Sequence, residues 1–165
     1  VHVLIEAFNK LTDGSAELMV YGDTSYAPNY HERLRQMAIN PGIRFMGSFN
    51  NNRVYEILAE TDVLFVPSIW YENSPLTIHE AALAGVPVIT SNIGGMAELI
   101  ERTKNGLLFQ VEDASDLHEK MKLLIDNPRL IKKLKGKAEE VKSLEENAKE
   151  LESIYLRLCN YPATN

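Results

Sequence analysis

Cysteine is nearly absent from this sequence of 165 residues, which contains only one, Cys159. A single cysteine excludes an internal disulfide and a metal site built from cysteines, and this usage fits a reducing compartment. The sequence also has no apolar run long enough to span a bilayer. These absences favour a cytoplasmic protein without a transmembrane segment.

Positive charge is also scarce, because 17 Lys and Arg residues stand against 23 Asp and Glu residues, for a formal net charge of -6. This balance argues against nucleic acid as a partner, since phosphate binding depends on clustered Lys and Arg. The one basic cluster, between Arg129 and Lys137, is followed directly by Glu139 and Glu140. We interpret that cluster as the solvated face of a helix.

Short apolar runs alternate with helical patterns along the chain, whose length fits one domain of ordinary size. Asp113 is expected to cap a helix, and the last helical region, to about Leu158, is expected to be interrupted by a capping box at Ser143 and Glu146. Strands that alternate with helices imply an α/β fold with a doubly wound parallel sheet. The strands are predicted at 17–21, 43–49, 63–66, 86–90 and 107–110.

The first residues already follow a helical pattern, with no capping residue and no initiator methionine ahead of it. We therefore expect residues 1–165 to form one domain cut from a longer protein. The apolar positions of this pattern are Val1, Leu4, Ile5, Phe8 and Leu11.

The strand at 63–66 leads into a loop and then a helix. Ser74 is a good N-cap, and Pro75 fits the first helical position because its φ is already set. Glu72 is therefore placed on the loop and Glu80 on the helix. A second unit follows, in which the strand at 86–90 leads to paired glycines that open another helix.

The paired glycines, Gly94 and Gly95, can expose bare backbone N–H groups at a positive helix end, which suits an anion such as phosphate. Ligands of open α/β sheets bind at the edge where such strands end. Along a continuous helix, Glu72 and Glu80 would lie roughly 12 Å apart. That spacing does not suit a pair of carboxylates flanking one glycosidic bond.

Two well-separated carboxylates suit a long ligand with hydroxyls at both ends. A nucleotide-sugar has a ribose diol at one end, a hexose at the other and a diphosphate between them. An ionised carboxylate can accept hydrogen bonds from both hydroxyls of a diol while it repels phosphate. Helix N-termini between Glu72 and Glu80 could supply the positive potential for the diphosphate.

At these residues the chain resembles the retaining glycosyltransferases of family four, and specifically their C-terminal, donor-binding, Rossmann-like domain of the GT-B fold. The resemblance covers essentially the whole sequence and implies that the first strand of the domain lies upstream of Val1. The motifs that carry it are Pro67-Ser68, Glu72 to Glu80, Ala84 to Val88, Gly94-Gly95 to Glu98, and Asn105 to Phe109.

The resemblance implies that Glu80 holds the ribose hydroxyls and that Glu72 is the catalytic-site residue, holding a hydroxyl of the transferred sugar. Gly94 and Gly95 would line the same cleft, and Gly22, after its strand, is a weaker candidate. The loop and first helical turn that wrap the sugar and phosphate would be Asn73, Ser74, Pro75, Leu76 and Thr77.

The chain departs from the family pattern in two ways. Ala97 stands where the family commonly has proline before the Glu of the Gly-Gly segment, an exchange that a helix start tolerates. The diphosphate-binding Arg and Lys of the family would lie upstream of Val1.

The implied function is retaining transfer of a hexose from a nucleotide-diphosphate sugar to a sugar or lipid-linked acceptor. The acceptor would be held by a separate N-terminal domain, which would also decide any membrane association. The family generally needs no bound metal, so neither a metal nor a cofactor is expected. Alone, this fragment is expected to bind nucleotide weakly and to have no transferase activity.

Other functions remain open. A nucleotide-sugar 2-epimerase or a glycosyl phosphorylase would share the fold, but no lysine in the Gly-rich region suggests the pyridoxal phosphate of a phosphorylase. An NAD-dependent enzyme is disfavoured because no Gly-x-Gly-x-x-Gly follows the first visible strand. A non-catalytic nucleotide-sugar-binding or interaction module is also possible.

Trp70 and Tyr71 fit packing and sugar or base stacking equally well, and His79 fits packing or solvation best.

Overall fold

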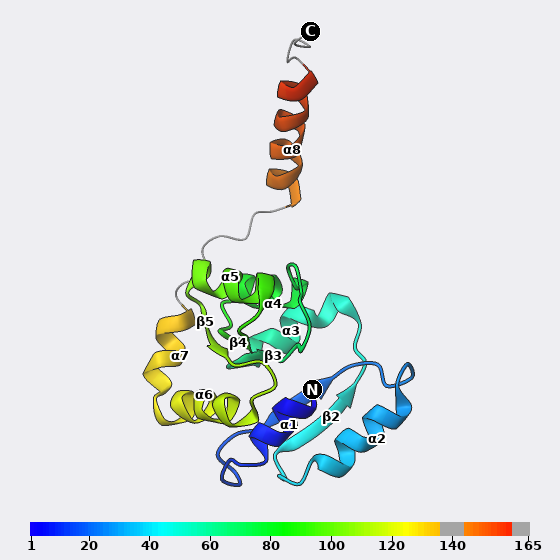
Figure 1. The fold of residues 1–165 in the computed structure, drawn as a ribbon, viewed down its shortest axis with the longest axis vertical. Coiled ribbons are helices and arrows are strands. Elements are labelled where there is room, and N and C mark those ends of the chain that lie inside the picture. The colour runs from blue at the N-terminus through cyan, green and yellow to red at the C-terminus, as the bar shows by residue number, and fades with distance from the viewer. Residues whose placement is uncertain (136–143, 160–165) are drawn as a thin grey trace.

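The structure, a computed structural model, describes residues 1–135 and 144–159, in which helices and strands alternate (Figure 1). The strands are β1 (Leu18–Tyr21), β2 (Ile43–Gly47), β3 (Leu64–Val66), β4 (Val88–Ser91) and β5 (Gly106–Phe109). The helices are α1 (His2–Phe8), α2 (Pro28–Met37), α3 (Val54–Ala59), preceded by the 3₁₀ turn η1 (Asn51–Arg53), α4 (Leu76–Leu83), α5 (Gly94–Thr103), α6 (Ala114–Asp126), α7 (Pro128–Lys135) and α8 (Leu144–Cys159).

Every strand pair is parallel, as the alternation of strands and helices predicts. The described strands form two sheets, β1-β2 and β3-β4-β5. In the first, Leu18 lies opposite Ile43, and in the second, Val88 of the central strand lies between Leu64 and Gly106. The α/β fold with parallel sheets is thus confirmed.

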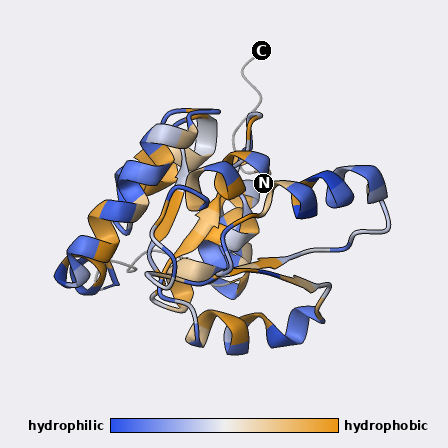
Figure 2. Cartoon of the chain, turned by 90° about the horizontal axis from the view of Figure 1, so that it is seen from below, coloured by the Kyte–Doolittle hydropathy of each residue, from blue (hydrophilic) through white to orange (hydrophobic). Residues whose placement is uncertain are grey.

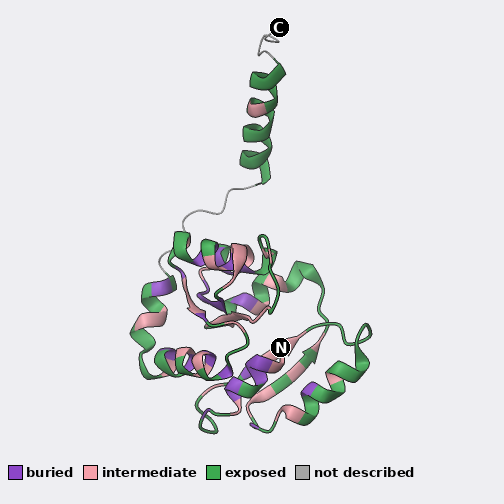
Figure 3. Ribbon diagram, viewed as in Figure 1, coloured by how far each residue is buried: buried purple, intermediate pink, exposed green. Residues whose placement is uncertain are grey.

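Helices cover both faces of the three-stranded sheet. Successive residues of its strands point to opposite sides, so each face contributes side chains to a core cluster with helices. Ile89 and Phe109 join a core cluster with α1 and α6, whereas Val88 joins a cluster with α4 and α5. All four residues of β4 are buried. Apolar strands between helices with polar outer faces are visible in Figure 2, and Figure 3 shows the same layers by burial. This three-layer arrangement is that of a doubly wound fold.

An apolar groove of about 760 Å³ lies between β1, an edge strand of the first sheet, and β3, an edge strand of the second sheet. Helices α1 and α6 also contribute to its wall, through Phe8 and Met121. β1 pairs only with β2, and β3 only with β4, in the described part of the chain. One edge of each strand therefore has no strand partner there.

Several predicted element ends shift by one or two residues. Strand β4 begins at Val88 and not at Val86, because the Val86 N–H bonds to the Ala81 carbonyl at the end of α4 and Pro87 has no N–H to donate. Asn50 caps the turn that opens α3, because its side chain accepts from the Asn52 N–H. The predicted cap at Ser143 lies outside the described residues.

Helix α1 confirms the predicted pattern at the start of the chain except at its two ends: Val1 precedes the helix and is 37% exposed, and Leu11 lies beyond the last helical residue, Phe8. Leu4, Ile5, Phe8 and Leu11 are all buried. At the other end, α8 has no buried residue, and Cys159 is exposed. No helix in residues 1–135 or 144–159 is long and apolar enough to cross a membrane.

Candidate functional site

Glu72 lies in the loop between β3 and α4, and two side chains of the same loop hold its carboxylate. The indole N–H of Trp70 donates to Glu72 Oε1 at 2.7 Å, and the Ser68 hydroxyl donates to the same oxygen at 3.2 Å. Glu72 is half-buried. Its second oxygen, Oε2, has no hydrogen-bond partner among the described residues. This oxygen is therefore free to accept a bond from a ligand.

The backbone of this loop packs directly against the start of α5. The Gly95 N–H donates to the Glu72 carbonyl at 3.1 Å, and a Cβ at Gly95 would collide with the Asn73 carbonyl oxygen. Gly94 has φ +53°, and a Cβ there would lie 3.0 Å from the Tyr71 ring. The glycine pair therefore lets the helix start approach the loop closely. The Gly95 N–H is thus bonded and is not one of the bare donors expected of this turn.

The start of α4 differs in detail from the prediction. Pro75, and not Ser74, is the N-cap residue, and no side chain caps the helix. The Ser74 hydroxyl instead lies 2.6 Å from Nε2 of His79, so it is hydrogen-bonded to a side chain of α4 and not to the first amides of the helix. The N–H groups of Leu76 and Thr77 thus remain open to an anion, because the first amides of a helix have no intrahelical acceptor. His79, expected only to pack or to be solvated, holds this turn.

Glu80 is the fifth residue of α4 and is half-buried. Its carboxylate makes no hydrogen bond or ion pair within the described part of the chain. Asn73 and Thr77 are exposed, and the Leu76 side chain is 75% exposed. The first turns of α4 thus combine open backbone donors with a carboxylate that can accept from two hydroxyls.

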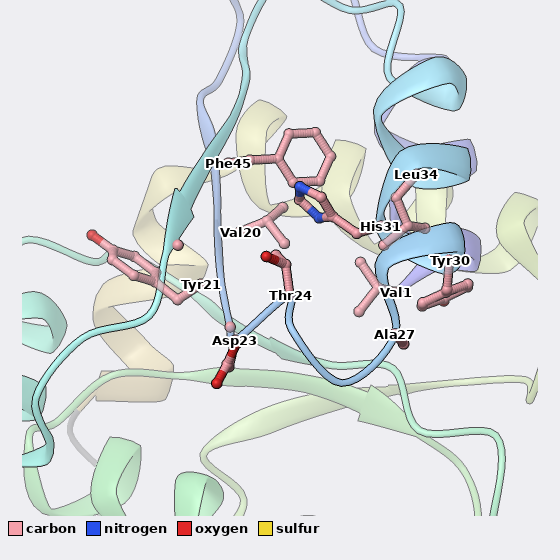
Figure 4. A pocket seen from close by; sticks show the side chains of 12 residues that line it. Val1, Val20, Tyr21, Asp23, Thr24, Ala27, Tyr30, His31, Leu34 and Phe45 are labelled. Atoms are coloured by element: carbon pink, nitrogen blue, oxygen red, sulfur yellow. The ribbon is translucent and has the colours of Figure 1, made fainter.

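Gly22 lies elsewhere, at the carboxyl end of β1. Its N–H donates to the Gly47 carbonyl at 2.9 Å. Figure 4 shows the pocket that it lines, about 140 Å³, with His31 and Phe45 among the other walls. Neither this pocket nor the groove between β1 and β3 is lined by Glu72 or Glu80. The structure therefore joins the Glu72 loop to Gly94 and Gly95, but does not join Gly22 to them.

Asp23 beside Gly22 is fully exposed, and the backbone N–H of Ser25 donates to its carboxylate at 2.8 Å. This bond lowers the pKa of the Asp23 carboxyl below its usual value. Asp23 thus stabilises the turn that follows β1. In residues 1–135 and 144–159, no three His, Cys, Asp or Glu side chains converge on a possible metal position.

The roles of Ser68 and Trp70 as partners of Glu72 were not predicted from the sequence. The prediction left Trp70 open between packing and stacking, but its side chain is 62% exposed and its one polar atom bonds to Glu72. The usable signal was its position two residues before a carboxylate, together with an indole N–H that needs an acceptor.

Comparison with known proteins gives a family. The sequence model described as "Glycosyl transferases group 1" matches residues 1–151. The chain is 28% identical over 130 residues to glycogen synthase of Mycobacterium tuberculosis, which covers 78% of this chain and 31% of that protein. It is 28% identical over 141 residues to N-acetyl-alpha-D-glucosaminyl L-malate synthase of Bacillus anthracis, covering 85% of this chain and 36% of that protein.

A solved structure shares the fold. The crystal structure of Anabaena HepE in complex with UDP and glucose superposes with a TM-score of 0.79 at 21% identity, over 93% of this chain and 44% of that one. The chain spans about a third of the length of the curated relatives that it matches.

Proposed function

The chain belongs to the group 1 glycosyl transferases and has the fold of their C-terminal GT-B domain, and we propose from this that it binds a nucleotide-diphosphate sugar. The longer protein would transfer a hexose from that donor, with retention at the anomeric carbon. The acceptor, a sugar or a lipid-linked sugar, would bind to a separate N-terminal domain.

The arrangement around α4 is the observation that carries this proposal. Glu80 has no protein partner among the described residues, and Glu72 has one oxygen without one. Between them lie the uncapped first amides of the helix. In the proposed complex, Glu80 accepts from the two ribose hydroxyls and Glu72 accepts from a hydroxyl of the sugar. The residues Asn73 to Thr77 wrap the sugar and the phosphates.

The diphosphate would be stabilised by helix N-termini and not by a bound metal. The N–H groups of Leu76 and Thr77 point along the helix axis, at the end where the macrodipole is positive. Donors of this kind are fixed before the reaction, so they stabilise the charge that develops as the diphosphate departs. Basic side chains of the longer protein would add to this potential.

The groove between β1 and β3 supports the proposal that residues 1–165 are part of a longer protein. A parallel strand in this groove would pair with both open edges and join the two sheets into one. The resulting order, with the new strand between β1 and β3, is the order of dinucleotide-binding folds. Because Val1 lines the pocket at the carboxyl end of β1, a short loop would connect such a strand to α1.

Nucleotide titration tests the donor site. We expect UDP, GDP or ADP, or one of their hexose derivatives UDP-glucose, GDP-mannose and ADP-glucose, to shift amide NMR signals of residues 72–80 and 94–95. Shifts confined to other segments would refute the site. Glu80→Gln is expected to weaken binding of both the diphosphate and its sugar derivative about tenfold, because a charge-assisted hydrogen bond is lost. Glu101→Gln, an exposed carboxylate further along α5, serves as the control.

A further inference from the structure

We infer that Trp70 is a positioning residue for Glu72, which fixes this carboxylate so that it presents Oε2 to the donor sugar. The inference rests on the proposed function, because it assumes that Glu72 meets the sugar. It adds a residue whose role neither the family pattern nor the sequence predicted, and it states which oxygen of Glu72 meets the sugar.

The contact itself is short and directional. The distance of 2.7 Å from Trp70 Nε1 to Glu72 Oε1 is at the short end for an N–H donor to an ionised acceptor. An indole has one donor and no acceptor, so this bond uses the whole polar capacity of the side chain. Hydrophobic burial does not explain the position of the ring, because Trp70 remains 62% exposed.

The second donor removes the remaining freedom of the carboxylate. The Ser68 hydroxyl also bonds to Oε1, at 3.2 Å, so two donors occupy the same oxygen. Rotation of the carboxylate would break both bonds at once. Oε2 is therefore the oxygen presented to a ligand, and Glu72 cannot hold a vicinal diol with one hydroxyl on each carboxylate oxygen. Glu80, with no such partners, keeps both oxygens for a diol.

The backbone beneath the side chains is held independently. Tyr71 packs over Gly94, and the Gly95 N–H fixes the Glu72 carbonyl. The path of the loop is thus set by α5, and the direction of the carboxylate is set by Trp70 and Ser68. This division predicts that removing the indole N–H misdirects the carboxylate without unfolding the loop.

The test compares the affinity for a nucleotide sugar with the affinity for its diphosphate alone, using whichever of UDP-glucose, GDP-mannose and ADP-glucose binds most tightly. The ratio of the two dissociation constants isolates the contribution of the sugar. Trp70→Phe keeps an aromatic ring but removes the N–H, and we expect it to reduce the sugar contribution about tenfold. The dissociation constant of the diphosphate alone should not change. Tyr55→Phe, another exposed aromatic, is the control and should alter neither constant.

A double-mutant cycle separates positioning from a structural role. If Trp70 acts through Glu72, Trp70→Phe should have no further effect in a Glu72→Gln background. Equal loss of affinity for the diphosphate and the sugar derivative would mean that Trp70 only maintains the loop, and would overturn the inference. An unchanged ratio in Trp70→Phe, or no sugar contribution in the unaltered chain, would overturn it while leaving nucleotide binding intact. If no nucleotide binds at all, the proposed function fails as well.

Discussion

The backbone N–H of Gly95 is bonded to the carbonyl oxygen of Glu72, which ties the first turn of α5 to the loop before α4. Through this bond two consecutive strand-loop-helix units share one structure at the edge where β3 and β4 end. The glycine is required because a Cβ at this position would collide with the Asn73 carbonyl oxygen. A substitution in one unit should therefore change the conformation of the other.

Gly95→Ala is expected to lower the free energy of unfolding by about 1–3 kcal/mol, because the new methyl group overpacks this contact. Urea denaturation measures the loss, and amide NMR shifts should spread from α5 to residues 71–73. Gly14→Ala is the control: its φ is +78°, but a Cβ there meets no atom within 4 Å. Shifts in the control should stay within its own turn. If Gly95→Ala left residues 71–73 undisturbed, the coupling described above would be wrong.

A second prediction concerns the neighbouring buried hydroxyls at the end of β4. The Ser91 hydroxyl is the one buried side-chain polar atom without a partner in residues 1–135 and 144–159, whereas the Thr90 hydroxyl donates to the Val66 carbonyl at 2.9 Å. Ser91→Ala should be neutral or stabilise the chain by up to about 1 kcal/mol, because it removes an unsatisfied group. Thr90→Val should destabilise it by about 0.5–1.5 kcal/mol. Denaturation curves that reversed this order would contradict the assignment.

Helix α6 provides a third prediction, because Asp113 caps it. Its carboxylate accepts from the N–H groups of Ser115 and Asp116, at 2.8 and 3.0 Å. Asp113→Ala should cost about 1 kcal/mol in the free energy of unfolding. Asp126→Ala, at the other end of the helix, removes only an exposed ion pair with Lys122 and should change stability by less than about 0.5 kcal/mol. Equal costs in the two variants would argue against the cap.

Asp116 provides a pH prediction. Partial burial raises the pKa of its carboxyl, but the hydrogen bond from the Gln110 N–H and the contact with Lys120 outweigh burial, so the pKa lies below its usual value. A carboxyl whose pKa is lower in the folded state stabilises the protein above the unfolded pKa, which is about 4. This contribution is lost as the pH falls through the lower, folded value.

Asp116→Asn should therefore lose less stability than the unaltered chain when the pH is lowered from neutral to below about 4. The measurement is the free energy of unfolding in urea at several pH values. Glu119→Gln serves as a control on the same helix, because Glu119 is exposed and makes no hydrogen bond or ion pair within the described residues. If Asp116→Asn showed the same acid dependence as the unaltered chain, the bond from Gln110 would have no electrostatic effect.

The sequence predicted the parallel α/β fold because its signals are local. The alternation of short apolar runs with helical patterns needs no knowledge of distant contacts, and Asp113 caps α6 as its position indicates. The buried face of α1 follows the same logic. The two positions flanking the start of α4, Glu72 and Glu80, were likewise placed correctly on a loop and on a helix.

The partners of individual polar groups could not be read from the sequence. Ser74 was predicted as an N-cap, but the hydroxyl of a loop serine has several possible partners. In the folded chain it is hydrogen-bonded to His79. The Gly95 N–H looked free because the loop that takes it comes from the preceding unit. The partner of Ser74 is a side chain five residues away and the partner of Gly95 is set by tertiary packing, and local propensity encodes neither choice.

The groove between β1 and β3 has a consequence for handling the chain in solution. A strand edge without a partner is a template for the edge of another molecule, and apolar walls favour such aggregation. Purified preparations of residues 1–165 should therefore self-associate as concentration rises, and light scattering should detect it. A charged side chain in place of Met19, which lines the groove from β1, is expected to keep the chain monomeric.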